Sequence, residues 1–312
     1  MPDRPRQRRL RDPEPLGGAA EVQLLGDGHE IPQFPGLHPA TVQPTDTPQV
    51  SSPTRTVLVA RPVAGRITGM SEQKIVLVTG ANKGIGYEIA AGLGALGWSV
   101  GVGARDGQRR DTAVEKLRAA GVDAFGVPLD VTDDASVAAA VEVVTERAGR
   151  LDVLVNNAAV TGGMPQHPTT VDLAAVQLAV ETNVLGVIRV TNAMLPLLRR
   201  SASPRIVNMS SSVGSLTRQT SSAGADVIGP LSAAYSPSKT FLNAVTIQYA
   251  KELRDTPILI NAGCPGFVAT DLNGHRGVRT PEQGAAVAIR LATLPDGGPT
   301  GEFFEDAGVV PW

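Results

Sequence analysis

The fold is decided by the stretch Ile75-Val76-Leu77-Val78-Thr79-Gly80-Ala81-Asn82-Lys83-Gly84-Ile85-Gly86. Its first five residues form a short apolar run rich in β-branched side chains, which predicts a buried strand. Apolar residues then recur at helical spacing over residues 84–96, which predicts a helix directly after the glycines. A strand that enters a helix through a glycine-rich turn is the setting in which a helix N-terminus binds a pyrophosphate.

The three glycines of this turn have separate expected roles. Gly80 allows the tight turn out of the strand, Gly84 lets a phosphate approach the backbone, and Gly86 lets the helix pack closely. The expected phosphate-binding residues of the turn are Gly80, Asn82, Lys83, Gly84, Ile85 and Gly86. A glycine-rich turn without a ligand is the alternative that the motif alone leaves open.

From residue 74 onward the chain alternates between strand and helix patterns. We expect strands at Ile75–Thr79, Ser99–Gly103, Ala124–Leu129, Asp152–Val155, Arg205–Met209, Ile258–Gly263 and Gly301–Phe304. We expect helices at Gly84–Leu96, Asp111–Ala120, Asp133–Ala148, Val171–Arg200, Tyr235–Arg254 and Pro281–Thr293. Repeated β-α units predict an α/β fold with a parallel sheet covered by helices on both faces. Right-handed crossovers make this sheet doubly wound and Rossmann-type, so residues 70–312 are expected to form one domain.

Residues 1–69 differ in composition from the rest of the chain. They hold 11 of the 24 prolines and keep neither a helical nor an alternating apolar pattern, which predicts a disordered extension. Acidic residues among the first arginines argue against a transit peptide, and no apolar signal-peptide region is found. A mis-assigned start is the second interpretation, because Met70 is followed directly by the beginning of a compact domain.

Composition narrows the classes of partner and compartment. The net charge of −2 gives no basic field for nucleic acid, and no apolar run approaches the length of a membrane span. The single cysteine, Cys264, has no disulfide partner and is expected to be packed, which fits a reducing, cytoplasmic location. The four histidines are scattered without metal-ligand spacing. Both a monomer and a homo-oligomer remain open.

A second motif is Tyr235-Ser236-Pro237-Ser238-Lys239. Residues four apart lie one turn from each other on the same helical face, so Tyr235 and Lys239 are expected to meet. A phenol with a pKa of about 10 is a poor acid or base at neutral pH. A neighbouring ammonium and an oxidised nicotinamide would stabilise the tyrosinate and lower this pKa. A packed tyrosine beside a surface lysine is the alternative.

The spacing of the first motif, G-x-x-x-G-x-G, together with the second motif, resembles the classical short-chain dehydrogenase/reductase family. The resemblance runs from about residue 74 to residue 304. It implies that Asp130 and Val131 contact adenine, and that Asn157 and Ala158 in Asn156-Asn157-Ala158-Ala159 support the adenine side of a dinucleotide. Ala159 replaces a family glycine, which only a positive φ would make costly. Nicotinamide contacts are implied for Pro265, Gly266, Val268 and Thr270, together with Tyr235 and Lys239.

The choice of cofactor follows from charge. Family members that use NAD place an acidic residue near the end of the second strand, where this chain has Ala104 followed by Arg105. Arg105 and Lys83 would neutralise a 2′-phosphate, so the expected cofactor is NADP(H). Asp106 is a counter-argument, because it could pair with Arg105. Two solvated surface cations are the alternative.

The resemblance also implies two further catalytic residues. Aligning Asn208-Met209-Ser210-Ser211-Ser212-Val213-Gly214 with the family's N-x-S-S-x-x-G assigns the substrate-binding hydroxyl to Ser211. Ser210 and Ser212 are close competitors in register. Asn183 resembles the family's fourth catalytic residue, and a distorted helical turn there would hold a water that relays protons from Lys239. A solvent-facing Asn183 is the alternative.

The expected function is therefore reduction of an aldehyde, ketone or quinone with NADPH, in which Tyr235 donates the proton. The same residues serve an alcohol dehydrogenase that acts in the oxidative direction. A non-catalytic NADP(H)-sensing protein and an isomerase or dehydratase are further alternatives, since a fold does not fix a function.

Two departures from the family shape the expected substrate site. Ser211 and Tyr235 lie 24 residues apart, longer than the usual interval, and the extra segment at about 216–232 is expected to form a substrate wall. The segment from Thr270 to Pro281 is short for the family's substrate lid. A short lid predicts an open pocket and broad tolerance for substrates.

Overall fold

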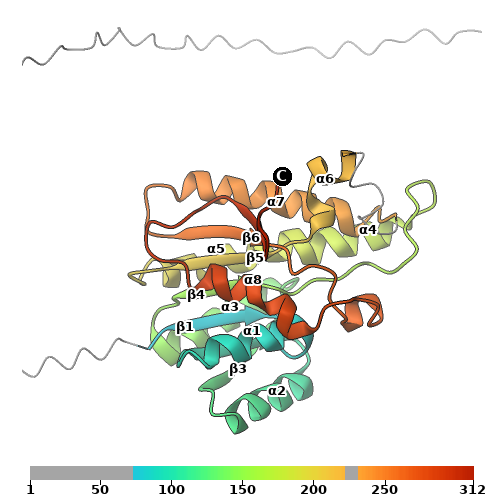
Figure 1. The fold of residues 1–312 in the computed structure, drawn as a ribbon. Coiled ribbons are helices and arrows are strands. Elements are labelled where there is room, and N and C mark those ends of the chain that lie inside the picture. The colour runs from blue at the N-terminus through green and yellow to red at the C-terminus, as the bar shows by residue number, and fades with distance from the viewer. Residues whose placement is uncertain (1–72, 222–230) are drawn as a thin grey trace, which may run out of the picture. The chain divides into compact units, whose positions relative to one another are not determined.

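The computed structural model describes residues 73–221 and 231–312 (Figure 1). The expected extension or mis-assigned start at residues 1–69 lies outside the described residues. So do residues 222–230, which make up much of the expected substrate wall. The expectations for residues 1–69 and for the substrate wall therefore stay predictions.

The described part of the chain builds one eight-stranded sheet with the order β3-β2-β1-β4-β5-β6-β7-β8. All neighbouring strands run parallel except β7 and β8, which are antiparallel. The strands are β1 (Ile75–Thr79), β2 (Ser99–Ala104), β3 (Ala124–Pro128), β4 (Val153–Asn156), β5 (Arg205–Met209), β6 (Leu259–Gly263), β7 (Phe303–Glu305) and β8 (Gly308–Val309). The predicted doubly wound α/β fold is confirmed.

Helices cover both faces of this sheet (Figure 1). One face carries α1 (Gly84–Gly94), α2 (Gly107–Ala119) and α8 (Pro281–Ala292). The other face carries α3 (Asp134–Ala148), α4 (Leu173–Val180), α5 (Gly186–Leu198) and α7 (Tyr235–Glu252). The short α6 (Leu216–Thr220) follows β5. Two separate apolar cores therefore lie above and below the sheet.

The alternation of side chains along β1 shows how these cores arise. Val76 and Val78 join the core under α1, α2 and α8, whereas Ile75 and Leu77 join the core under α3 and α5. Because successive side chains of a strand point to opposite faces, a strand buried on both sides must be apolar throughout. This explains why the central strand is a continuous apolar run.

Three elements differ from the sequence prediction in a way that has a structural reason, while the ends of the others differ by at most two residues. Helix α2 begins at Gly107 and not at Asp111, because the Asp106 side chain accepts a hydrogen bond from Arg109 N and caps the helix four residues earlier. The predicted helix 171–200 is observed over Leu173–Leu198, with a π-helical turn, η1 (Glu181–Leu185), inside it. The last predicted strand starts two residues later, and the hairpin that it forms with β8 was missed.

The helix Leu173–Leu198 is, by length and composition alone, able to cross a membrane, which the sequence analysis did not find for any segment. Its inner side chains, among them Val190, Met194 and Leu197, pack in the core against the sheet. A core helix of a folded domain has the same composition, so the length of this helix assigns no membrane role.

The strand order places the site. The chain winds outward from β1 toward β3 and then, from β4, outward in the opposite direction, so the connections after β1 and β4 leave on opposite faces. A crevice forms at such a switch point, outside the carboxyl ends of the strands, and ligands of open α/β sheets bind there.

Candidate active site

A cleft of about 1410 Å³ lies at this switch point. It is lined by residues that follow the carboxyl ends of β1, β2, β4, β5 and β6, for example Gly80, Arg105, Asn157, Ser211 and Pro265. Every residue predicted to bind the cofactor lines it. Of the predicted catalytic residues, Ser211, Tyr235 and Lys239 also line the cleft, and Asn183 does not.

The glycine turn has the conformation that its sequence predicts. Gly80 and Gly84 have φ values of 66° and 57°, a region that residues with a side chain rarely adopt. A Cβ on Gly86 would lie 2.5 Å from both the Gly80 carbonyl oxygen and Asn157 Nδ2, so the first turn of α1 can approach only as glycine. Next to Gly84 a Cβ would meet nothing nearer than a Thr270 methyl group at 3.5 Å, so the backbone there is open toward the cleft.

Asn157 braces this turn from the neighbouring strand. Its Nδ2 donates to the Thr79 carbonyl oxygen at 2.9 Å, while Thr79 Oγ1 accepts from the backbone N–H groups of Asn157 and Ala158, both at 3.0 Å. In the described residues His275 is the sole non-glycine residue with positive φ, so Ala159 has a negative φ. The replacement of the family glycine by Ala159 is therefore mild, as predicted.

The adenosine end of the cleft carries cations. Arg105 is exposed. The Asp106 carboxylate pairs with Arg109, with 3.6 Å between Oδ2 and Nε, and not with Arg105 as the counter-argument assumed. Arg109 also lines the cleft, which the sequence analysis missed. Burial alone would raise the pKa of Asp130, but hydrogen bonds from Thr132 and the charges of Arg105 and Arg189 lower it. The adenine side of the cleft therefore holds a carboxylate near Arg105.

Lys83 has a partner that its sequence position does not predict. Its Nζ contacts the Asp271 carboxylate, which also accepts from His275 Nε2 at 2.8 Å. Lys83 and Asp271 are each about half exposed, at 51% and 54%. The segment after Thr270 therefore reaches across to the glycine turn, and Lys83 must exchange or share this partner to contact a phosphate.

The three serines after β5 have different surroundings. Ser210 is buried and its hydroxyl donates to Asn243 Oδ1 at 2.6 Å. Ser212 is hydrogen-bonded to Cys264, which is itself buried as predicted. Ser211 lines the cleft together with Tyr235, and its hydroxyl is close enough to lower the pKa of that phenol. Of the three candidate registers, the structure brings Ser211 to the tyrosine.

Tyr235 is the first residue of α7, and the start of this helix is fixed by Gln166, a residue far away in the sequence. Gln166 Oε1 accepts from the backbone N–H groups of Ala234 at 3.1 Å and Tyr235 at 3.2 Å, and from the Ser232 hydroxyl at 2.8 Å. These donors would otherwise lack partners at the helix end. Gln166 lies 69 residues before Tyr235, so no local sequence signal identified it.

Lys239 lies one turn further along α7 and is buried. Its Nζ donates to the Met209 carbonyl oxygen at 2.7 Å and lies 5.6 Å from the centre of the Tyr235 ring. Burial lowers the pKa of Lys239 to about 8, because the ammonium loses its hydration. The predicted meeting of Tyr235 and Lys239 on one helical face is confirmed.

The predicted lowering of the pKa of Tyr235 depends on an oxidised nicotinamide as well as on Lys239, so it stays a prediction; burial acts in the opposite direction. Burial raises the pKa of Tyr235 and the nearby Cys264 adds to the rise, while the Ser211 side chain opposes it. Tyr235 is therefore a neutral phenol at neutral pH. Lys239, whose pKa burial lowers to about 8, is still charged at neutral pH and can stabilise a tyrosinate that forms there.

Asn183 lies in the π-helical turn η1, so the distorted helix expected there is observed. Its side chain is fully buried and does not face solvent or the cleft. Asn183 Oδ1 accepts from Val160 N at 2.9 Å, and Nδ2 donates to the Val160 carbonyl oxygen at 2.8 Å and to Ser238 Oγ at 2.9 Å. The Asn183 side chain therefore fixes one wall of the cleft to α7, and it does not reach the reacting groups.

The segment after β6 forms another part of the lining of the cleft. Pro265, Gly266, Val268 and Thr270 line it, and Val268 forms a parallel β-bridge with Arg279. The lid between them folds back through the short helix η3 (Asp271–Asn273), capped by Thr270. In residues 73–221 and 231–312 no group of three or more His, Cys, Asp or Glu side chains is placed to hold a metal ion.

Fold and site together define a dinucleotide-binding α/β protein with a serine, a tyrosine and a lysine gathered where a nicotinamide would lie. The chain matches the family model of short chain dehydrogenases over residues 74–279, and it belongs to that family. The resemblance found in the motifs is thereby confirmed.

The alignments with known proteins cover nearly the whole length of each relative. Short-chain dehydrogenase/reductase 1 of Saponaria officinalis is 33% identical over 302 residues, covering 78% of this chain and 97% of the relative. Carbonyl reductase (NADPH) 1 of Sus scrofa is 33% identical over 279 residues, covering 78% and 95%. The solved NADPH-bound carbonyl reductase from chicken fatty liver has a TM-score of 0.68 at 30% identity, covering 77% and 99%. The last two names agree with the predicted cofactor.

Proposed function

We propose that this protein reduces a carbonyl group of an aldehyde, ketone or quinone to an alcohol with NADP(H). One observation carries the proposal: the side chains of Ser211, Tyr235 and Lys239 line the same cleft as the glycine turn and Arg105. Reductase names among the relatives of comparable length support the same direction of reaction.

The residues at the phosphate end fit a dinucleotide. The open backbone at Gly84 and the free N–H groups at the start of α1 would hold the pyrophosphate. Arg105 and Arg109 would neutralise the 2′-phosphate that distinguishes NADP(H), and a planar guanidinium can also stack on adenine. When bound, NADPH supplies the hydride that converts the carbonyl carbon to its reduced state.

The residues at the catalytic end manage the substrate oxygen. Ser211 Oγ would donate a hydrogen bond to this oxygen as its negative charge develops. Tyr235 would then donate its phenolic proton, which it still carries at neutral pH because burial raises its pKa. Lys239, charged below about pH 8, would stabilise the tyrosinate left behind, and Asn183 would hold the wall beside Ser238 in place.

The walls of the cleft favour an apolar substrate. Met164, Leu178, Phe267 and Leu272 line it and are also among the exposed large apolar side chains, so they would cover a substrate rather than pack in the core. The segment from Thr270 to Pro281 is short by its sequence for a substrate lid of this family, and this favours a pocket open to substrates of different size. Broad tolerance for aldehydes, ketones and quinones is therefore part of the proposal.

The test is an NADPH-oxidation assay over a panel of aldehydes, ketones and quinones, with the alcohol identified as product. Turnover with several members at comparable kcat/KM supports the proposal, and a single narrow substrate contradicts the broad tolerance. NADPH binding without turnover on any member would favour a sensing protein. Conversion of a substrate without net NADPH consumption would favour an isomerase or dehydratase.

A further inference from the structure

Two consecutive carboxylates, Glu305 and Asp306, lie where β7 ends and the turn to β8 begins. The backbone of this hairpin is held by α8, where Arg290 Nη2 donates to the Glu305 carbonyl oxygen at 2.7 Å and the guanidinium lies 5.5 Å from the centre of the Phe304 ring. These backbone contacts do not involve the two carboxylates. The hairpin is therefore a fixed platform from which each carboxylate can be removed separately.

Glu305 reaches the element that follows the serine loop. Its two oxygens accept from Arg218 Nη1 at 2.8 Å and Nη2 at 2.7 Å, a bidentate pair with both side chains about two-thirds buried. Arg218 is a residue of α6, which starts directly after the turn η2 (Ser212–Gly214). Ser215, the capping residue of α6, donates in turn to the Pro311 carbonyl oxygen at 2.5 Å.

The serine loop is thus bound at its far end to the last segment of the chain. Thr217 contributes a second link, since its N–H and its hydroxyl donate to the Trp312 carbonyl oxygen at 3.1 and 2.7 Å. On its near side the loop packs tightly, because a Cβ on Gly214 would lie 2.9 Å from the Lys239 carbonyl carbon. A shift of α6 would therefore be transmitted to Ser211.

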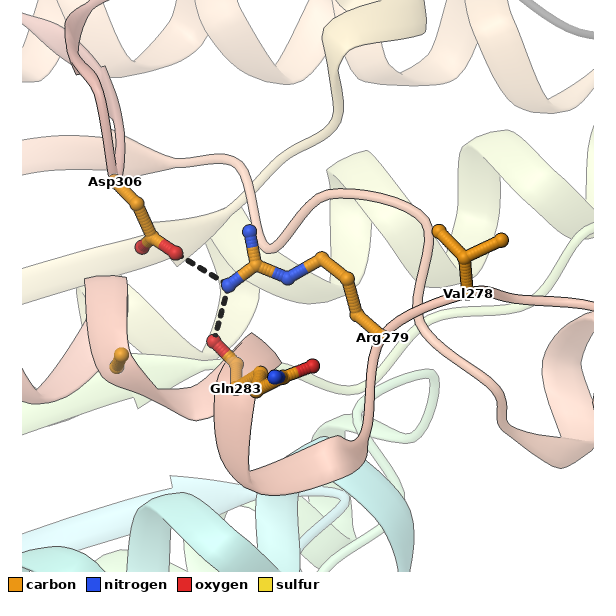
Figure 2. A pocket seen from close by; sticks show the side chains of 5 residues that line it. Val278, Arg279, Gln283 and Asp306 are labelled. Carbon is orange, nitrogen blue, oxygen red and sulfur yellow. Dashed lines mark hydrogen bonds and ion pairs between the residues drawn. The ribbon is translucent and has the colours of Figure 1, made fainter.

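Asp306 reaches Arg279 in a separate pocket, behind the segment that lines the cleft (Figure 2). Its carboxylate contacts Arg279 Nη2, which also donates to the Gln283 carbonyl oxygen at 2.6 Å. Asp306 is the carboxylate that pairs with this guanidinium among the described residues, whereas Arg279 Nε is buried there without a hydrogen-bond partner. An arginine that loses its carboxylate in such a place leaves a poorly solvated charge.

Arg279 in turn supports the segment proposed to hold the nicotinamide. A Cβ on Gly266 would lie 2.8 Å from Arg279 Cδ, so the arginine stem lies directly against that glycine. The backbone of Arg279 donates to the Phe267 carbonyl oxygen at 3.1 Å and accepts from Ala269 N at 2.9 Å. The wall from Pro265 to Thr270 and its arginine therefore move together.

We propose that Glu305 and Asp306 are positioning residues that act separately: Glu305 holds the Ser211 loop through Arg218, and Asp306 holds the Pro265–Thr270 wall through Arg279. The functional part of this inference rests on the proposed function. The Arg218 guanidinium lowers the pKa of Glu305, which keeps the carboxylate charged at neutral pH. Neither carboxylate lines the large cleft, so neither is a catalytic residue.

The experiment is hydrogen exchange measured by mass spectrometry on the full chain, with two single variants. Glu305→Gln is expected to speed exchange over residues 212–220 and to leave residues 266–283 unchanged. Asp306→Asn is expected to do the reverse. Glu302→Gln is the matched control, because the structure gives this neighbouring carboxylate no hydrogen bond or ion pair within the described residues, and it should change neither segment.

Binding and kinetics give a second, independent readout. For Glu305→Gln we expect kcat/KM for the carbonyl substrate to fall about two- to fivefold with an unchanged Kd for NADPH, since both ion pairs are partly exposed. For Asp306→Asn we expect the Kd for NADPH to rise by a factor of about two to five, again as for a partly exposed pair. The exchanged pair Arg218→Glu with Glu305→Arg is expected to restore slow exchange over residues 212–220.

The inference is overturned if each variant loosens both segments equally, if neither variant changes its own segment, or if the exchanged pair gives no rescue. Exchange rates do not depend on turnover. If the unaltered protein reduces no carbonyl, the proposed function fails, while the exchange data still decide whether the two anchors act separately.

Discussion

The two ends of the cleft recognise their ligands by different means. At the phosphate end the binding surface is mainly backbone, shaped by the positive φ of Gly80 and Gly84, and the cations there are exposed to solvent. At the catalytic end the groups that matter are buried side chains, and the pKa values of Tyr235 and Lys239 are shifted by that burial. Burial disfavours the charged form of each group, so it raises the pKa of the Tyr235 phenol and lowers the pKa of the Lys239 ammonium.

The difference makes a general prediction. Loss of a side chain at the catalytic end should cost far more activity than loss of a side chain at the phosphate end, where solvent screens each charge. The predictions that follow test this contrast, in order of decreasing effect.

The largest of these effects is expected for Ser211→Ala, which removes the hydroxyl that lines the cleft together with Tyr235. We expect kcat to fall by about 10²–10³-fold, the range for loss of one donor to a developing oxyanion, with an unchanged Kd for NADPH. Steady-state kinetics and NADPH fluorescence titration measure the two quantities. Ser212→Ala is the matched control and should retain most of the activity. Equal losses in the two variants would place the functional hydroxyl in a different register.

A smaller effect is expected from pH. Burial lowers the pKa of Lys239 to about 8, so its ammonium is present below that pH and is lost as the pH rises through it. The rate of reduction at saturating NADPH should therefore be level near pH 7 and fall by about tenfold per pH unit well above 8. A pH–rate profile measures this, and Lys239→Arg, which stays charged, should lack the fall at high pH. A wild-type profile that stays level to pH 10 would contradict the role of Lys239.

The smallest effect is expected at the exposed cations. Arg105→Ser should raise the Kd for NADPH by roughly three- to tenfold, because a screened, exposed charge contributes only modestly to affinity. NADH has no 2′-phosphate and is the built-in control, so its Kd should not change. Arg109→Ser should behave in the same way if Arg109, which the sequence analysis missed, also contacts the phosphate. An equal loss for NADH would mean that these arginines support the fold.

Local patterns predicted the parts of the molecule that local contacts build. The strand, glycine turn and helix of residues 75–86 and the i, i+4 pair of Tyr235 and Lys239 depend on neighbours in sequence, and they were found. Gln166, which caps α7, and the hairpin that carries Glu305 depend on contacts between distant segments. No periodicity or motif marks such contacts.

Further features of the site also depend on the packed structure. Burial, which raises the pKa of Tyr235, is a property of the folded chain that residue spacing does not show. Asn183 lies in the expected distorted turn, and its side chain is hydrogen-bonded to Val160 and Ser238, whereas the proton relay through a water stays a prediction. Residue type and spacing identified both positions, but only the packed structure shows which of their atoms are free to act.

The most direct test of this account is a single-turnover reduction with the Tyr235→Phe protein, at saturating NADPH and with a carbonyl that the unaltered protein reduces. The account predicts that the variant binds NADPH with the same Kd and oxidises it at least about 10²–10⁴-fold more slowly, the range for loss of a general acid. Oxidation of NADPH at the unaltered rate, with alcohol as product, would show that the proton comes from elsewhere.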